Sequence, residues 1–363
     1  MTRKLATVRT IDDITPIVGA DRIVAAHIGG WPVVVAKDYF TIGDKCVYFE
    51  PDAMLPLTNP LFAPLANRGR NRFNSREVPC VVLKTVKLRG QLSQGLAFSL
   101  HDLGIDADTP VGEDVSELLE VEKYDPPEVI TQTGRMSTFP SFIMKTDEER
   151  VQNLPMMVDW LVEHPDIAAL FRASEKLDGT STSYYRSVDM DGNIRYGACS
   201  RNNEVLHSDG NGDEDNLYWR NYEAYGIQSH LDAIAALRPH ASSVVIQGES
   251  TGPGINGNRL GRKSLEFHAF NVIIDGERFN PADKVFGLDS VVPQLDLKLP
   301  VDGVDGRTAL QNIIDMSYGR RSVIEPNRLA EGVVWRYDGE PVDGMNPAWR
   351  HFKSINNKYL LKE

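Results

Sequence analysis

Residues 174–180 read Ser-Glu-Lys-Leu-Asp-Gly-Thr, and this stretch decides how the rest of the chain is interpreted. Lys176 carries an amine that is a nucleophile only when it is unprotonated, a state that nearby cations or burial favour. Asp178 supplies a carboxylate that can act on a metal ion, and Gly179 lets the backbone turn tightly beside a ligand. Because lysine beside Asp-Gly is more often a surface turn, the residues that follow must decide between the two interpretations.

Five further patterns follow Lys176 along the chain. One of them, residues 243–249, is a β-branched run that ends in Gly248-Glu249, which predicts a buried strand with a carboxylate at its C-terminal end. The others surround Arg201 in residues 198–202, Phe267 and Phe270 in residues 265–272, Glu331 in residues 330–335, and Lys353 in residues 352–356.

In this order, the six patterns resemble the sequence elements of the covalent nucleotidyltransferase superfamily, the ATP-dependent ligases and mRNA capping enzymes. The resemblance implies that Lys176 attacks the α-phosphate of a nucleotide and carries it as a lysyl-NMP phosphoramidate. It also implies a metal ion, Mg²⁺ or Mn²⁺, near Asp178, Glu331 and Glu249. The implied nucleotide-binding residues are Glu175, Ser181, Arg201, Glu249, Lys353 and Phe270, with Phe267 as the alternative ring for stacking on the purine.

The last pattern departs from many relatives, which carry two lysines separated by one residue. Position 355 is Ile355 here, so Lys353 is the residue to which the resemblance assigns the α-phosphate. Lys358 is either a second cation or, as we expect, a solvated charge.

The layout predicts two domains, an OB-like nucleic-acid-binding domain with an acidic linker over residues 1–130 and an adenylyltransferase domain over residues 131–363. The first part contains short β-rich runs separated by Gly, Pro and Asp, at residues 23–28, 33–35, 46–49 and 81–86. Because only ten residues follow Lys353, we expect no OB domain after the catalytic one. The predicted class is α+β, a β-barrel followed by an ATP-grasp-like ligase domain of antiparallel sheets and helices.

This layout resembles the Deinococcus/Naegleria-type ATP-dependent RNA ligase family. The resemblance includes residues 43–50, 139–142 and 145–153 and therefore covers most of the chain. It implies sealing of 3′-OH and 5′-phosphate ends, with RNA on the 3′-OH side of a nick, in RNA repair. The alternatives are a DNA ligase, a capping-type guanylyltransferase, or a catalytically silent nucleic-acid-binding protein with a ligase fold.

The net charge of −12 is unevenly distributed. Residues 102–128 hold ten acidic residues against one lysine, whereas residues 68–89 hold seven basic residues against Glu77. A local cationic stripe is what phosphate binding needs, and Phe73 could stack on a base. The alternative is a solvated loop followed by an ordinary charged strand. The predicted nucleic-acid contacts are Arg68, Arg70, Arg72, Arg76, Lys84, Lys87 and Arg89.

Residues 146–149 read Thr-Asp-Glu-Glu, which predicts a capping box with Thr146 as N-cap and Glu149 three residues later. Arg150 follows, either as a helix-surface charge or as a residue that reaches the nucleotide phosphates. Residues 252–257 match Gly-x-Gly-x-x-Gly after a predicted strand, but no apolar helical face follows, so we expect a flexible loop.

The compartment and partners follow from composition. The three cysteines have no metal spacing, no apolar run reaches 18 residues, and the N-terminus lacks a signal-peptide core. We therefore expect a cytoplasmic monomer that binds ATP and an RNA or RNA/DNA duplex with a nick or ends, and no membrane.

Overall fold

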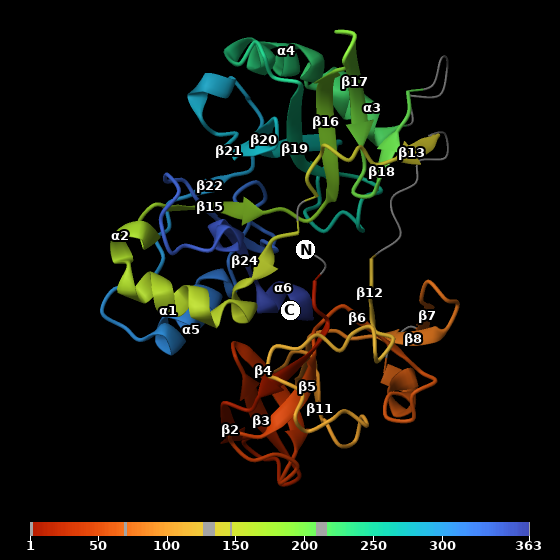
Figure 1. Ribbon diagram of the computed structural model, residues 1–363, viewed down its shortest axis with the longest axis vertical. Helices are drawn as coiled ribbons and strands as arrows, with labels where there is room; N and C mark the ends of the chain where they lie inside the picture. Colours follow the sequence, from red (N-terminus) through yellow and green to blue (C-terminus); the bar gives the residue numbers. More distant parts are fainter. Residues whose placement is uncertain (1–2, 69–70, 126–134, 146, 208–215, 363) are drawn as a thin grey trace.

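The computed structural model describes residues 3–68, 71–125, 135–145, 147–207 and 216–362. Its N-terminal region is built from short antiparallel strands around a shared interior (Figure 1). The strands are β1 (Ala6–Thr10), β2 (Asp13–Pro16), β3 (Ile23–Ile28), β4 (Trp31–Ala36), β5 (Lys45–Phe49), β6 (Ala53–Pro56), β7 (Asn71–Phe73), β8 (Pro79–Val82), β9 (Val86–Leu88), β10 (Gln91–Ser93), β11 (Leu96–Ser99) and β12 (Glu122–Lys123), with a 3₁₀ turn η1 at Ala63–Arg68.

The barrel contains two three-stranded sheets, of order β1-β5-β11 and β2-β3-β4. The two sheets are connected because β4 packs on β10 and β11. Large side chains such as Trp31, Phe49 and Phe62 are fully buried inside it. The predicted run at residues 81–86 divides into β8 and β9. β8 ends at Val82 and β9 begins at Val86, and the main chain of Leu83 between them still pairs with Asp52 and Ala53.

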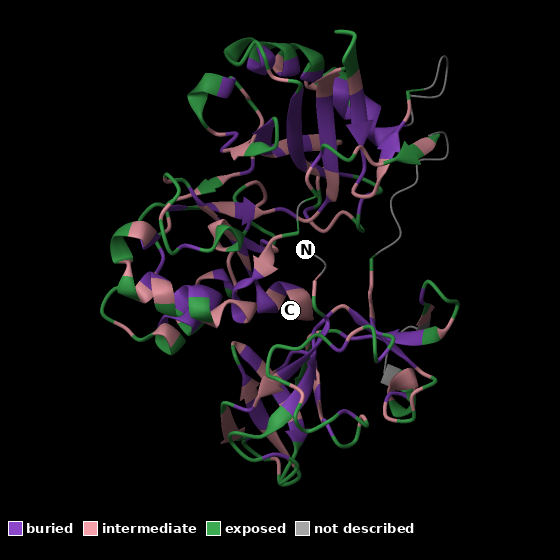
Figure 2. Cartoon of the chain, in the orientation of Figure 1, coloured by how far each residue is buried: buried purple, intermediate pink, exposed green. Residues whose placement is uncertain are grey.

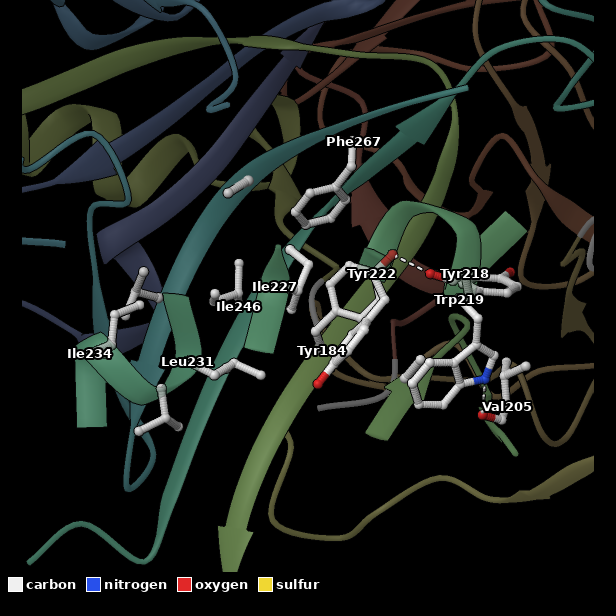
Figure 3. Close-up of a cluster of buried hydrophobic side chains, with 14 of the residues drawn as sticks. Tyr184, Val205, Tyr218, Trp219, Tyr222, Ile227, Leu231, Ile234, Ile246 and Phe267 are labelled. Atoms are coloured by element: carbon white, nitrogen blue, oxygen red, sulfur yellow. Dashed lines mark hydrogen bonds between the residues drawn. The ribbon is translucent and has the colours of Figure 1, made fainter. Parts of the chain in front are cut away.

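The second region contains a seven-stranded antiparallel sheet, ordered β13-β18-β17-β16-β19-β20-β21. Helices α3 and α4 pack on it, and Tyr184, Trp219, Leu231 and Phe267 lie in the core between them (Figure 3). Its elements are β13 (Met136–Thr138), β16 (Thr180–Val188), β17 (Ile194–Cys199), β18 (Asn203–Val205), α3 (Leu217–Ala224), α4 (Ile227–Leu237), β19 (Ser243–Thr251), β20 (Glu266–Ile274) and β21 (Glu277–Phe279).

A five-stranded sheet, ordered β14-β24-β23-β15-β22, lies between that sheet and the barrel (Figure 1). Helices α1 and α5 pack together beside it, around a core that includes Trp335 and Phe352. The strands and flanking helices of this part are β14 (Glu149–Arg150), η2 (Val151–Asn153), α1 (Pro155–Glu163), α2 (Pro165–Ala168), β15 (Phe171–Lys176), β22 (Gln294–Leu295), α5 (Gly306–Ser317), β23 (Gly332–Tyr337), η5 (Pro347–Arg350), β24 (His351–Ile355) and α6 (Asn357–Leu361). The 3₁₀ turn η4 (Lys284–Phe286) packs against α4, beside the seven-stranded sheet.

The two sheets are joined directly at the predicted nucleophile. β15 ends at Lys176 and, after residues 177–179, the chain enters β16 of the other sheet. Buried residues follow the strands of both sheets, while exposed residues cover the outer faces of the helices and the hairpin tips (Figure 2). Side chains at the end of β15 therefore lie where both sheets can contribute functional groups.

The barrel is attached to the five-stranded sheet by several hydrogen bonds. The indole of Trp31 donates to Asn153 Oδ1 at 2.7 Å, and the buried Gln94 amide donates to Asn357 Oδ1 at 3.0 Å. The boundary expected at residue 130 falls within residues 126–134, which lie outside the described residues. Along the part of the chain that the structure describes, no helix is both long and apolar enough to cross a membrane.

The capping box predicted at residues 146–149 is wrong. Glu149 and Arg150 form the short strand β14, parallel to Phe352 and Lys353 of β24, and the helix begins only at Pro155. The local pattern is overridden because these main-chain groups pair in a sheet, and Glu149 Oε1 instead accepts from Asn153 Nδ2 at 2.9 Å. Thr146 itself lies outside the described residues.

Leu231→Ala tests the core beneath α4. The Leu231 side chain is completely buried, so its truncation leaves a cavity and should lower the free energy of unfolding by about 2–5 kcal/mol. Leu237→Ala on the same helix is the control, because Leu237 is 46% exposed and should change the free energy by less than about 1 kcal/mol. Urea unfolding measures both variants, and equal losses would contradict the assigned packing.

Candidate active site

Lys176 lies among three carboxylates that arrive from different parts of the chain. Its Nζ donates to Glu331 Oε2 at 2.7 Å, and the Lys176 side chain is 26% exposed. Glu331 immediately precedes β23, Glu249 lies on β19, and Asp178 follows the nucleophile by two residues. The structure thus brings together the predicted catalytic lysine and all three predicted metal-site acids.

The charges of three acids dominate the electrostatics of Lys176 in the metal-free protein. Burial alone would lower the pKa of Lys176, but the negative charges of Glu331, Glu249 and Asp178 outweigh burial, so the pKa is raised. The pKa is raised because the charged residues closest to the amine are acids. In this state Lys176 is held as an ammonium ion.

The pKa of Glu249 is also shifted by its charged neighbours. Burial, together with repulsion from Glu331 and Asp178, raises the pKa of Glu249 to about 8, although the Lys176 charge opposes the shift. A divalent cation among these acids would relieve the repulsion that they exert on one another.

Gly179 is required by close packing rather than by a turn with positive φ. A Cβ on Gly179 would lie 2.2 Å from the Ser250 carbonyl oxygen and 2.9 Å from Glu249 Cγ. The glycine in the Lys-x-Asp-Gly pattern therefore lets the β15–β16 connection lie directly against β19. Gly332 serves the same purpose after Glu331, since its Cβ would lie 2.3 Å from the Ser354 carbonyl oxygen.

Ser181 and Phe270, two predicted nucleotide-binding residues, lie close to Glu249 and to the residue after Lys176 respectively. Ser181 is the cross-strand partner of Glu249 in the β16–β19 pair. Phe270 is half-buried and packs near Leu177. Phe267, the alternative stacking residue, is 2% exposed and packs its ring against Tyr184 in the core. Phe270 is therefore the better candidate for stacking on a base.

Glu175 is turned away from the nucleophile, because adjacent strand residues point to opposite faces. Its carboxylate is 2% exposed, and Oε2 accepts from the main-chain N–H of Val323 at 2.7 Å. This contact supports the loop that leads to Glu331. We accordingly reassign Glu175 from nucleotide contact to support of that loop.

Lys353 and Arg201 meet at a carboxylate that the sequence analysis did not single out. Asp147 lies 3.1 Å from Lys353 Nζ, 2.5 Å from Lys123 Nζ and 3.7 Å from Arg201 Nη2. Burial and the positive charges of Lys176 and Arg150 together outweigh the attraction of Asp147 and lower the pKa of Lys353. Lys123 comes from β12, which pairs with β6 in the N-terminal region, so both regions contribute cations here. Only the three-dimensional structure reveals this cluster.

Arg150 is a buried strand residue, which excludes the helix-surface interpretation. It lies opposite Lys353 in the β14–β24 pair, contacts Asp52 of the barrel at 3.4 Å, and stacks 5.6 Å from the centre of the Trp31 ring. Its Nε and Nη1 atoms are buried and have no hydrogen-bond partner among the described residues. Such donors are costly to leave unpaired, and a bound anion or water molecule would satisfy them.

The predicted basic stripe divides between two hairpins. Arg72 lies 5.8 Å from the centre of the Tyr124 ring and Arg76 pairs with Glu120 at 2.9 Å, both on the β7–β8 hairpin. Lys87 and Arg89 belong to the β9–β10 hairpin, and Lys84 is exposed between the two. Phe73 is 71% exposed. The Arg68 side chain and Arg70 lie outside the described residues.

A β-barrel followed by two sheets that enclose a lysine among carboxylates defines a ligase of the covalent nucleotidyltransferase class. Residues 5–100 match the profile of an OB-fold domain family, and residues 170–353 match the profile of the RNA ligase family. The chain belongs to the RNA ligase family and is an enzyme of that family.

Solved structures extend this similarity over the whole chain. A mutant of Naegleria gruberi RNA ligase with AMP and manganese is 31% identical, with a TM-score of 0.80 over 99% of each chain. A second mutant of that ligase, with ATP and manganese, has the same identity, coverage and TM-score. Naegleria gruberi RNA ligase with pyrophosphate is also 31% identical, with a TM-score of 0.79 over 99% of this chain and 98% of that one. No curated protein sequence matches the chain.

Glu249→Gln tests the crowding of the acids. Because folding raises the pKa of Glu249 to about 8, the folded state binds its proton more tightly than the unfolded state does. Below about pH 4.5 the carboxyl group is protonated in both the folded and the unfolded protein, so it does not change the free energy of unfolding. As the pH rises from there toward 8, the unfolded state loses this proton more readily, and the free energy of unfolding decreases.

In metal-free buffer, Glu249→Gln should stabilise the protein at pH 9 by about 1–3 kcal/mol and have little effect at pH 4. Glu223→Gln, on the exposed face of α3, is the control and should change neither value. Chemical denaturation at the two pH values measures the difference. A Glu249→Gln protein that is less stable at pH 9 than the wild type would contradict the assigned repulsion.

Proposed function

We propose that this protein is an ATP-dependent polynucleotide ligase that joins 3′-OH and 5′-phosphate ends, at nicks with RNA on the 3′-OH side. The observation that carries the proposal is Lys176 held 2.7 Å from Glu331, within the field of Glu249 and Asp178. Family membership and the nucleotides bound to the Naegleria gruberi structures support ATP as the nucleotide.

The first step is transfer of AMP to the enzyme. The Lys176 amine attacks the α-phosphorus of ATP, a P–N bond forms, and the bond to the β-phosphate bridging oxygen breaks as pyrophosphate leaves. Lys176 must lose a proton to do so, and Glu331 accepts its hydrogen bond at the right position. Lys353, close enough for Lys176 to affect its pKa, would offset charge on the α-phosphate.

Two transfers complete the reaction. The 5′-phosphate of the nucleic acid displaces Lys176 from the AMP phosphorus, which gives a 5′-5′ pyrophosphate-linked end. The 3′-OH then attacks the 5′-phosphate, and AMP leaves. Each step exchanges one phosphate linkage for another, so the protein acts mainly by aligning groups and offsetting charge.

The residues around Lys176 fit a hydrated divalent cation. Glu331, Glu249 and Asp178 supply hard oxygen ligands, and their mutual repulsion favours a positive ion among them. In the described residues, no group of three or more His, Cys, Asp or Glu side chains is arranged to hold a metal ion directly. Mg²⁺ or Mn²⁺, held by Glu331, Glu249 and Asp178 through its bound waters, would offset phosphate charge and weaken the hold of the acids on the lysine proton.

The barrel has two proposed roles. Asp52 holds Arg150 next to Lys353, and Lys123 reaches Asp147, so the barrel supports the part of the site where phosphates would bind. The unpaired Nε and Nη1 of Arg150 fit a phosphate oxygen there. Independently, Arg72, Lys84, Arg89 and the exposed Phe73 provide a surface for a nucleic-acid backbone and base.

The alternatives differ in nucleotide or in chemistry. A capping-type enzyme would label with GTP, a DNA ligase would prefer DNA on the 3′-OH side, and a silent module would form no adduct. The three cysteines are free and buried, which agrees with action in the cytoplasm. We propose that the enzyme works as a monomer.

Lys176→Ala should abolish the covalent adduct, because the change removes the amine to which the P–N bond forms. The variant should lose at least about 1,000-fold in nick sealing, while a nick that already carries 5′-AMP should still be sealed. Labelled ATP and peptide mass spectrometry measure the adduct, and Lys263→Ala, an exposed lysine, is the control. An AMP adduct on any residue of the Lys176→Ala variant would contradict the assignment of Lys176 as the nucleophile.

Substitutions in the barrel separate its two roles. Asp52→Asn should lower adduct formation, because Arg150 loses the partner that fixes it. The triple change Arg72→Ala, Lys84→Ala and Arg89→Ala should instead lower nick sealing and flatten the salt dependence of duplex binding, by about 0.9 in log–log slope for each phosphate that the protein no longer neutralises.

The control for the triple change removes two exposed cations elsewhere on the barrel, Arg22→Ala and Lys37→Ala. Adduct formation and sealing are measured on each folded variant. Equal loss of both activities in the triple variant would refute the docking role, and unchanged adduct formation in Asp52→Asn would refute the supporting role.

A further inference from the structure

The carboxylate of Asp178 is held by two side chains that lie far from it in the sequence. Oδ2 accepts a short hydrogen bond from the Tyr359 hydroxyl, and Oδ1 accepts from Asn256 Nδ2 at 3.4 Å. A carboxylate has about four acceptor positions, so two remain available after these bonds form. The two donors therefore fix the orientation of the Asp178 carboxylate and leave acceptor positions on it available for another ligand.

Tyr359 is itself rigidly placed. Its side chain is 6% exposed, and the guanidinium carbon of Arg259 lies 3.5 Å from the centre of its ring. Arg259 also donates to the Tyr359 carbonyl oxygen at 2.7 Å. The cation covers the ring face and bonds the main chain at once, which leaves the hydroxyl little freedom to point elsewhere.

The helix that carries Tyr359 is tied to Glu331 as well. Asn356 caps α6, accepting from the main-chain N–H groups of Lys358 and Tyr359, and its own main-chain N–H donates to the Glu331 carbonyl oxygen at 2.9 Å. The Asn356 side chain also donates to the Ala330 carbonyl oxygen at 2.9 Å. One short helix thus anchors two of the acids that face Lys176.

Asn256 belongs to the glycine-rich segment that the sequence analysis interpreted as a flexible loop after Glu249. Its φ is 44°, an unusual conformation for a residue other than glycine, and its Nδ2 also donates a short hydrogen bond to the Gly179 carbonyl oxygen. Asparagine tolerates this backbone while offering a donor that glycine lacks. The loop therefore reaches back to the residue that follows Asp178.

From these contacts we propose that Tyr359 and Asn256, with Arg259 behind the tyrosine ring, are positioning residues that aim the Asp178 carboxylate at the divalent cation. The inference rests on the proposed function, in which Asp178 holds that cation. The Tyr359 hydroxyl acts through Asp178, and the glycine-rich loop and the C-terminal helix belong to the active site.

Tyr359→Phe tests the hydroxyl alone, because the ring and its contact with Arg259 remain. We expect the Mg²⁺ concentration that half-saturates Lys176 adenylylation to rise by about tenfold, with the rate at saturating Mg²⁺ within about threefold of wild type. A role limited to packing α6 would lower thermal stability and leave the metal requirement unchanged.

Tyr196→Phe is the matched control. Tyr196, on β17, donates the same kind of bond to Asp232 Oδ1 of α4 at 2.6 Å. The Tyr196→Phe variant should leave the metal requirement of adenylylation unchanged. Asn256→Gly, which keeps the left-handed backbone and removes the amide, should raise the requirement as Tyr359→Phe does, and it serves if Tyr359→Phe folds poorly.

A binding measurement provides a readout besides activity. Calorimetric titration of Mn²⁺ into the full-length protein saturated with an α,β-methylene analogue of ATP should show weaker binding for Tyr359→Phe and Asn256→Gly, and wild-type binding for Tyr196→Phe. Wild-type metal affinity in both Tyr359→Phe and Asn256→Gly would overturn the inference.

Asp178→Asn separates this inference from the function on which it rests. If Asp178→Asn shows the raised metal requirement and Tyr359→Phe does not, the positioning role fails and the proposed function stands. If Asp178→Asn itself keeps the wild-type metal requirement, the metal role of Asp178 fails, and the positioning role fails with it. In a double variant, Tyr359→Phe should add nothing to Asp178→Asn, because the hydroxyl then has no carboxylate to orient.

Discussion

The attraction between one lysine and three carboxylates is the interaction on which this active site depends. Lys176 ends a strand of the five-stranded sheet, while Glu249 lies on the seven-stranded sheet. Their approach requires Gly179, because a Cβ there would overlap both Ser250 and Glu249. The two sheets can therefore share one site only while this contact between strands is preserved.

The same arrangement imposes an electrostatic condition on catalysis. The acids that keep the site together also raise the pKa of Lys176, so the resting amine is protonated. A divalent cation would use the same acids and reduce their hold on that proton. The barrel supports this centre at its phosphate side through Asp52 and Lys123, and the C-terminal helix supports it at the metal side through Tyr359.

Sequence patterns predicted what short stretches of chain determine. The β-branched run ending at Glu249 forms β19, and the β-rich runs of the first region form its barrel. Lys176, Asp178, Glu249 and Glu331 could be found because each has a distinctive local pattern, and the structure brings all four together. The family and the fold class were predicted for the same reason.

Features that depend on distant residues could not be predicted in this way. The capping pattern at Thr146 gave no sign that Glu149 and Arg150 would pair with β24, some 200 residues later. The pKa direction of Lys176 depends on Glu331, which lies 155 residues away. Local patterns assigned no role to Asp147 or Tyr359, because their roles come from partners that are distant in the sequence.

The protonation state of Lys176 tests the account most directly. Full-length protein containing lysine labelled with ¹³C at Cε can be titrated by NMR, and Lys176→Ala identifies the resonance. The account predicts a pKa above the ordinary lysine value of 10.5 in metal-free protein, with a decrease when Mg²⁺ is added or Glu331 is changed to glutamine. A pKa at or below 10.5 in the metal-free protein, insensitive to both changes, would contradict the central role of the carboxylates.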